Sequence, residues 1–104
     1  MKGAPMTACN QPLTVDLTGQ RVAISAGAGG IGRVMADAFA ERGARVFVCD
    51  VDEEALADCP HPRMRADMSE VAECERFVDA AAAQWGGLDV LVNNAGIAGP
   101  TARI

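Results

Sequence analysis

The sequence has no apolar run of about eighteen residues and no sustained apolar segment near its N-terminus, so we expect neither membrane insertion nor secretion. Positive charge is also scarce. Nine Lys and Arg residues against fourteen Asp and Glu residues give a net charge of −5 and a pI near 4.6. This balance argues against nucleic acid and anionic membranes as partners, because both select for basic patches.

Metal-binding cysteine pairs are absent as well. The four cysteines show no Cys-x-x-Cys spacing, which predicts no metal site and reduced thiols in a cytoplasmic protein; they are Cys9, Cys49, Cys59 and Cys74. The single histidine, His61, stands between Pro60 and Pro62. We predict that it is a surface residue rather than a ligand or a general base, since both roles need partners that orient the ring.

The 104 residues, half of them apolar, suffice for one small domain but not for a complete six-stranded dinucleotide-binding sheet. Residues 1–16 contain two prolines and little periodicity, so we expect a flexible N-terminal extension. Residues 17–104 are then one partial domain.

A glycine-rich turn follows the apolar run Val22–Ile24 and opens a helical pattern that ends near Gly43. Gly27, Gly29 and Gly32 match the spacing G-x-G-x-x-G. Glycine lets a backbone turn tightly and approach a ligand, and a helix that starts there directs free N–H groups at an anion. We predict a dinucleotide pyrophosphate at this turn, although tight turns also need glycine for steric reasons alone.

Asp50 ends a second apolar run, Arg45–Cys49, eighteen positions after Gly32. A dinucleotide-binding fold places at this point the acid that binds the adenosine ribose hydroxyls. Its charge would repel a 2′-phosphate, and the glycine turn contains no basic residue, so NAD is favoured over NADP. The alternative is a solvated acid or a cap for the helix that begins at Glu53.

Downstream patterns complete an alternation of strands and helices. We predict a short helix over 52–58, a weak strand over 63–66, a long helix capped by Ser69 and a strand over 88–92. Phe77 and Trp85 lie on the apolar stripe of the long helix, where core packing is a better interpretation than a stacking surface for a base. Four strands alternating with three helices imply a parallel α/β sheet, and right-handed crossovers fix much of its topology. We predict a doubly wound sheet of order 3-2-1-4.

Several motifs together resemble the N-terminal half of a short-chain dehydrogenase/reductase: the ending Gly30-Ile31-Gly32, Asp50, the pair Asp67-Met68, and Leu91-Val92-Asn93-Asn94-Ala95-Gly96. The resemblance implies a truncated Rossmann-like fold that binds NAD. Its implied cofactor-binding residues are Gly27, Gly29, Gly30, Ile31 and Gly32 at the pyrophosphate, Asp50 at the ribose, Asp67 and Met68 at the adenine, and Asn93, Ala95 and Gly96 along the cofactor. Ala26 departs from the pattern, since it occupies the place of the family's first glycine.

The family's hydride transfer between an alcohol and a carbonyl depends on a Tyr-x-x-x-Lys pair and an upstream serine. This sequence has no tyrosine, and its one lysine is Lys2. We therefore assign no catalytic residue and expect a fragment of a longer NAD-dependent oxidoreductase, inactive by itself and without the part that binds the alcohol or carbonyl substrate.

Two other hypotheses remain open. The fourth strand would be an apolar open edge, which suits a non-catalytic nucleotide-binding or assembly module that forms a homo-oligomer or pairs with another chain. A methyltransferase-type domain that binds S-adenosylmethionine also combines a glycine turn with an acid, but the motif Asn93-Asn94-Ala95-Gly96 argues against it.

Overall fold

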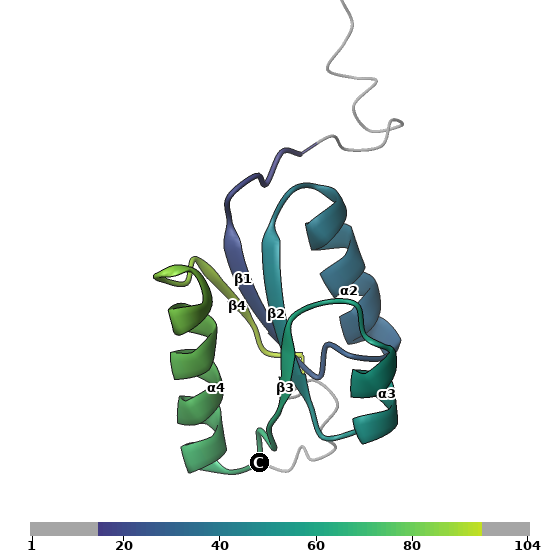
Figure 1. Cartoon of the computed structure of the whole chain (residues 1–104), viewed down its shortest axis with the longest axis vertical. Helices are drawn as coiled ribbons and strands as arrows, with labels where there is room; N and C mark the ends of the chain where they lie inside the picture. Colours follow the sequence, from purple (N-terminus) through teal and green to yellow (C-terminus); the bar gives the residue numbers. More distant parts are fainter. Residues whose placement is uncertain (1–14, 95–104) are drawn as a thin grey trace, which may run out of the picture.

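A four-stranded parallel sheet forms the centre of the protein in the computed structural model, which describes residues 15–94 (Figure 1). The spatial order is β3-β2-β1-β4, as predicted. The strands are β1 (Arg21–Ser25), β2 (Arg45–Asp50), β3 (Arg63–Arg65) and β4 (Val90–Val92). All three strand pairs are parallel, so the strands end at the same edge of the sheet, the lower edge in Figure 1.

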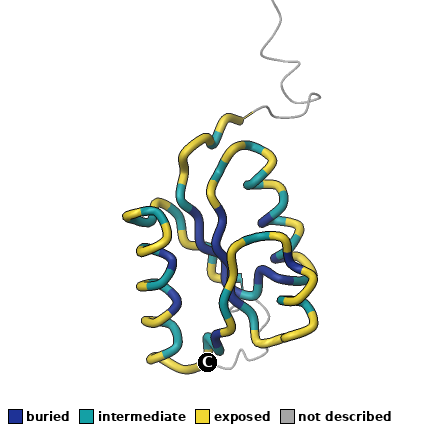
Figure 2. Tube along the Cα trace, in the orientation of Figure 1, coloured by how far each residue is buried: buried dark blue, intermediate teal, exposed yellow. Residues whose placement is uncertain are grey.

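Helices cover both faces of this sheet. Helices α2 (Gly30–Glu41) and α3 (Glu53–Asp58) pack on one face and α4 (Val71–Trp85) packs on the other (Figure 1). The alternation of side chains in β1 explains the two layers, because Val22 and Ile24 join the core under α2 and α3 while Ala23 joins the core under α4. The most buried segments are accordingly the two central strands (Figure 2).

Two aromatic side chains lie in the core on the α4 side. Phe77 of α4 is fully buried, and its ring stacks on that of Phe47 in β2 with the centroids 5.8 Å apart. Trp85 is half-buried against the same cluster. The prediction that these side chains belong to the core is confirmed, and Cys49 is buried there as expected.

The start of α4 differs from the prediction. The residue that precedes the helix is Glu70, and no side chain caps it. Ser69 is not the cap, because its backbone N–H and its hydroxyl both donate to the Asp67 carboxylate, at 3.0 and 2.7 Å. The short-range turn formed by Asp67 takes the hydroxyl that a cap would have used.

The prediction that His61 is a surface residue is wrong. Only 12% of its side chain is exposed, and its Nε2 lies 2.7 Å from the Asp37 carboxylate. The proline-flanked segment between α3 and β3 brings the ring against α2, and Asp37 supplies the orienting partner that the sequence pattern did not reveal.

Strand β4 forms one edge of the sheet within the described residues. Leu91 is the register partner of Ala23, so it faces the α4 side, yet it is 49% exposed. The expected apolar edge is therefore present. None of the helices within residues 15–94 is long and apolar enough to span a membrane.

Candidate functional site

The glycine turn joins β1 to α2 at the edge where the strands end. Its backbone is tied to β2 by a 3.1 Å hydrogen bond from the Gly27 N–H to the Cys49 carbonyl. Ala26 adopts a left-handed conformation with φ of 54°. The turn thus needs a left-handed residue at this position, which L side chains disfavour. This is a physical reason for a glycine where Ala26 departs from the family pattern.

Gly32 marks a close approach between α2 and the turn. A Cβ atom at this position would lie 2.0 Å from the Ala26 carbonyl oxygen and 2.7 Å from the Asn94 side-chain nitrogen. No larger residue fits without moving the turn, so the third glycine of the spacing has a packing role.

The backbone N–H groups at the N-terminus of α2 have no capping side chain. Gly29 precedes the helix, and the first turn of α2 carries no acidic residue. The partial positive charge of a helix N-terminus is therefore left for an outside anion. Gly30 and Ile31 lie in this first turn, both exposed, with Ile31 at 73%.

Asp50 lies at the end of β2 and faces this turn. One carboxylate oxygen accepts a 3.2 Å hydrogen bond from the Ala28 N–H, and the other accepts from the N–H groups of Val51 and Asp52. Helix α3 is capped instead by Asp52, whose side chain accepts from the Glu54 and Ala55 N–H groups. The alternative interpretation of Asp50 as the cap of that helix is therefore excluded.

The segment after β4 closes the other side of the turn. The Asn94 side-chain amide donates to the Ala26 carbonyl at 3.1 Å, and the buried Ser25 hydroxyl lies 3.3 Å from the Asn93 side-chain oxygen. Sequence reasoning did not select Asn94 as a site residue, although it lies in the motif that was recognised. Ala95 and Gly96 lie outside the described residues.

Asp67 and Met68 follow β3 at the same edge. The contacts from Ser69 hold the pKa of the Asp67 carboxyl below its ordinary value, so the group is charged at neutral pH. Its backbone N–H donates to Glu73 at 3.1 Å. Met68 packs against the core cluster that contains Phe77. Its side chain is thus partly committed to the core.

The side chains of the site can bind a ligand, but none of those described is a reactive nucleophile. Cys49 lies next to the glycine turn, but burial raises the pKa of its thiol to about 11, which keeps it protonated and unreactive. Residues 15–94 contain no cluster of three His, Cys, Asp or Glu side chains that would hold a metal ion. The arrangement suits an extended anionic ligand that lies across the ends of β1, β2, β3 and β4.

Comparisons with known proteins show the family of this chain. The family model for short chain dehydrogenase matches residues 20–104. Cis-4-hydroxycyclohexanecarboxylate dehydrogenase of Sinomonas cyclohexanicum is 45% identical over 94 residues, which cover 82% of this chain and 38% of that protein. The chain spans about a third of the length of such relatives.

Solved structures show the same fold. RhlG of Pseudomonas aeruginosa in complex with NADP is 36% identical with a TM-score of 0.68, over 78% of this chain and 36% of that one. A 3-ketoacyl-(acyl-carrier-protein) reductase of Brucella melitensis in complex with NADH is 30% identical with a TM-score of 0.65, over 73% of this chain and 34% of that one. The chain, with its glycine turn, its acid at the end of β2 and its Asn-Asn-Ala-Gly segment, therefore belongs to the short-chain dehydrogenase family.

Proposed function

We propose that this chain is the cofactor-binding part of an oxidoreductase that transfers a hydride between NAD and an alcohol or carbonyl compound. The turn Gly27–Gly32 and the N-terminus of α2 hold the pyrophosphate, since their N–H groups and dipole favour an anion. The residues that bind NAD in this proposal all lie at the edge of the sheet where the strands end.

The observation that carries the proposal is the position of Asp50. Its carboxylate reaches the Ala28 N–H in the glycine turn, so one acid is anchored between the end of β2 and the pyrophosphate-binding turn. An ionised carboxylate has about four lone-pair sites, and three backbone N–H groups occupy part of them. The remainder accepts from the ribose hydroxyls of NAD. The same charge opposes a 2′-phosphate.

The other assigned residues complete the cofactor site in this proposal. Asp67 and Met68 border the adenine, with the charged Asp67 carboxylate as the polar contact. Asn93, Ala95 and Gly96 border the rest of the cofactor, and Asn94 holds the turn in place through the Ala26 carbonyl.

This chain does not supply the catalytic pair. It contains no tyrosine. The hydroxyl of Ser25 is buried against β4 and that of Ser69 is bonded to Asp67. The proton-transfer groups and the substrate pocket belong, in our proposal, to a longer protein of which this chain is the N-terminal part.

Calorimetric titration of the purified chain with NAD, NADP and S-adenosylmethionine tests the proposal. We expect saturable NAD binding that is at least about tenfold weaker in Asp50→Ala, because one charged hydrogen-bonding group is lost. Asp58→Ala, which removes an exposed carboxylate at the far end of α3, is the matched control. Tighter binding of S-adenosylmethionine than of NAD would refute the proposal.

An assembly module is the second candidate, and the half-exposed Leu91 on edge strand β4 is the observation that favours it. An apolar strand edge pairs readily with another chain. Sedimentation of the chain across a range of concentrations tests the homo-oligomer, because a concentration-independent monomer would exclude self-pairing through β4.

A further inference from the structure

We propose that Arg65 controls how strongly the cofactor site rejects a 2′-phosphate, and that Glu53 restrains its guanidinium. The inference deepens the proposed function and rests on it. The glycine turn contains no basic residue, but the fold brings Arg65 from another strand to the acid that excludes the 2′-phosphate.

The sheet register places Arg65 beside Asp50. The two residues are partners across the parallel pair β2 and β3, and the Ala66 N–H donates to the Asp50 carbonyl at 3.2 Å. Register partners in neighbouring strands are about 5 Å apart and direct their side chains to the same face. Val48, two residues before Asp50, belongs to the core under α2 and α3. Arg65 and Asp50 therefore share the face that the glycine turn also occupies.

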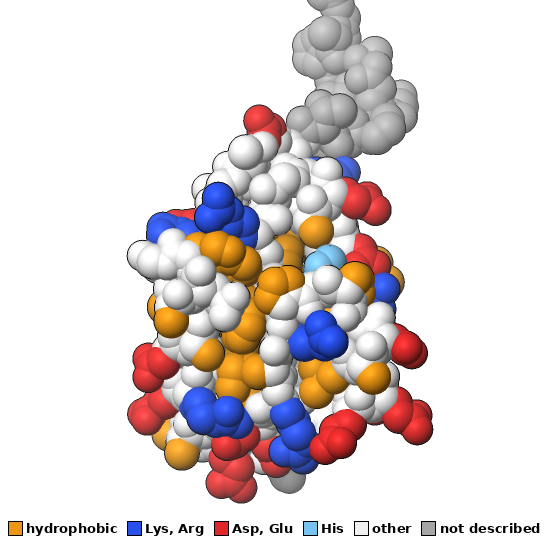
Figure 3. Space-filling view, viewed as in Figure 1, with side chains coloured by type: hydrophobic (Ala, Val, Ile, Leu, Met, Phe, Trp, Pro, Cys, Tyr) orange, Lys and Arg blue, Asp and Glu red, His pale blue; other side chains and the backbone are white. Residues whose placement is uncertain are grey.

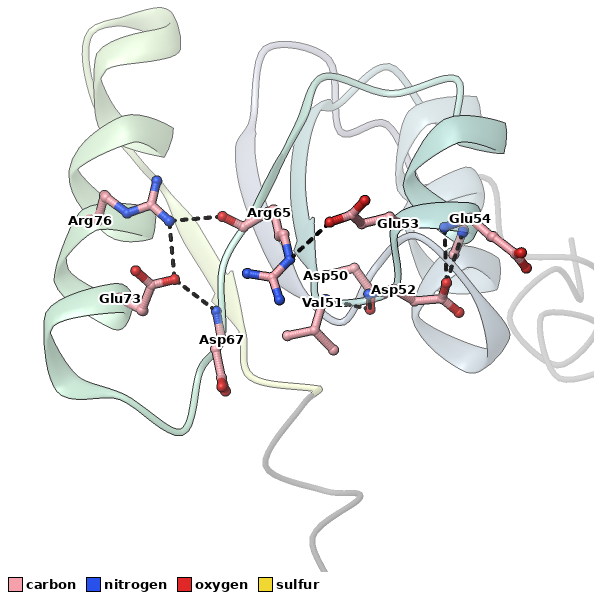
Figure 4. Close-up of polar contacts among 10 residues, drawn as sticks. Asp50, Val51, Asp52, Glu53, Glu54, Arg65, Asp67, Glu73 and Arg76 are labelled. Atoms are coloured by element: carbon pink, nitrogen blue, oxygen red, sulfur yellow. Dashed lines mark hydrogen bonds and ion pairs between the residues drawn. The ribbon is translucent and has the colours of Figure 1, made fainter.

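Within residues 15–94 the guanidinium of Arg65 forms an ion pair with Glu53, and its charge also acts on the carboxylates of Asp67 and Glu73. Its Nε lies 3.6 Å from a carboxylate oxygen of Glu53, with 54% of the Arg65 side chain and 81% of the Glu53 side chain exposed. Figure 4 shows the two side chains meeting across the ends of β2 and β3, above Val51. Exposed pairs of this kind are weak, whereas a guanidinium binds phosphate through two parallel hydrogen bonds. A nearby phosphate therefore competes well with Glu53.

Charges of both signs surround this position. Glu73 accepts from an Arg76 nitrogen at 3.1 Å, and the same nitrogen donates to the Arg65 carbonyl at 2.9 Å (Figure 4). Arginine and acidic side chains are interleaved over this end of the molecule (Figure 3). The preference for NAD consequently depends on the balance between the repulsion by Asp50 and the attraction by Arg65. Glu53 shifts this balance toward NAD because its ion pair with the Arg65 guanidinium competes with a 2′-phosphate.

The test is titration of the full chain with NAD and with NADP. In Glu53→Gln the guanidinium is released, and we expect the ratio of the NADP dissociation constant to that of NAD to fall by about three- to tenfold. In Arg65→Gln we expect NADP to bind about three- to tenfold more weakly while NAD changes by less than about twofold. The double variant should lose the gain seen in Glu53→Gln, since the two residues act through one contact.

Two neighbouring residues provide matched controls. Glu54→Gln removes an exposed charge from the same turn of α3 as Glu53. Arg63→Gln removes a guanidinium from the start of β3, two residues before Arg65. Neither should alter the cofactor ratio by more than about twofold. An unchanged ratio in Glu53→Gln, or an equal change in the controls, would overturn the inference while NAD binding still supported the proposed function. Failure of the folded wild-type chain to bind either dinucleotide would overturn both.

Discussion

The side-chain amide of Asn94 donates a 3.1 Å hydrogen bond to the carbonyl of Ala26, the residue that turns the chain out of β1 in a left-handed conformation. The contact joins the end of edge strand β4 to the turn that we assign to the pyrophosphate. The same amide lies where a side chain at Gly32 would stand. The shape of the turn therefore depends on three elements that are distant in the sequence.

Removal of this amide should weaken both stability and binding. Asn94→Ala leaves the partly buried Ala26 carbonyl without its donor, which costs about 1–2 kcal/mol in the free energy of unfolding. Urea unfolding measures that loss, and calorimetry should show weaker NAD binding. Gln84→Ala, which removes an exposed amide from α4, should change neither quantity.

An alanine at Gly32 should be far more disruptive than one at Gly29. The added Cβ would lie 2.0 Å from the Ala26 carbonyl oxygen, so the turn must move, and overpacking of this kind costs about 1–3 kcal/mol. At Gly29 the new Cβ would make an ordinary 3.5 Å contact with Ala55. Thermal unfolding of the two variants compares them directly, and equal melting temperatures would contradict the geometry of the turn.

The left-handed conformation of Ala26 predicts a stabilising substitution. Glycine avoids the clash that an L side chain suffers there, so Ala26→Gly should raise the free energy of unfolding by up to about 1 kcal/mol. Ala28→Gly should lower it, because that residue is buried and its φ is not positive. Chemical denaturation of both variants separates a local conformational effect from a general effect of glycine.

The pair Arg21–Asp89 should make stability depend on pH at the acid end. The Asp89 carboxylate accepts from the Arg21 side chain at 2.8 and 2.9 Å and from its backbone N–H at 2.9 Å, which lowers the pKa of Asp89 from 3.8 to about 2. A lowered pKa in the folded state contributes stability above the ordinary value and loses it as the pH falls through the lowered one. Asp89→Asn should therefore be less stable than the wild type at pH 5.

The difference in stability between the wild type and Asp89→Asn should shrink between about pH 4 and pH 2, as measured by urea midpoints at each pH. Asp79→Asn, which neutralises an exposed acid on α4, should show no comparable trend. A constant difference down to pH 2 would mean that the contact does not depend on the charge of Asp89.

The contact between His61 and Asp37 predicts a second acid-dependent effect. The hydrogen bond with His61 is the main cause that lowers the pKa of Asp37, and Arg33 adds to it. His61→Ala should therefore reduce stability above the ordinary Asp37 pKa of 3.8, with a smaller penalty below it. Arg33→Gln should reduce stability less. Thermal melts at pH 6 and pH 3 give the comparison. A larger effect of Arg33→Gln than of His61→Ala would contradict the conclusion that His61 lowers the pKa of Asp37 more than Arg33 does.

Local patterns were enough to predict the elements of this fold. The apolar runs at β1 and β2, the helical stripe of α4 and the glycine turn predicted the alternation of strands and helices, because burial leaves a periodic record in the sequence. The two errors came from polar contacts that the apolar patterns do not record, one between near neighbours in the chain and one between distant residues. Ser69 bonds to Asp67 rather than capping α4, and His61 is held by Asp37 from a helix that comes much earlier in the chain.

The sequence by itself determined the order of strands and helices, the glycine turn and the acid at the end of β2, since each depends on residues within one short segment. Only the tertiary structure decided which distant groups meet at that acid. Parallel pairing places Arg65 next to Asp50, and the end of β4 brings Asn94 to Ala26. Such neighbours arise from sheet register and crossover packing, which join residues far apart in the chain and leave no mark in the spacing of either one.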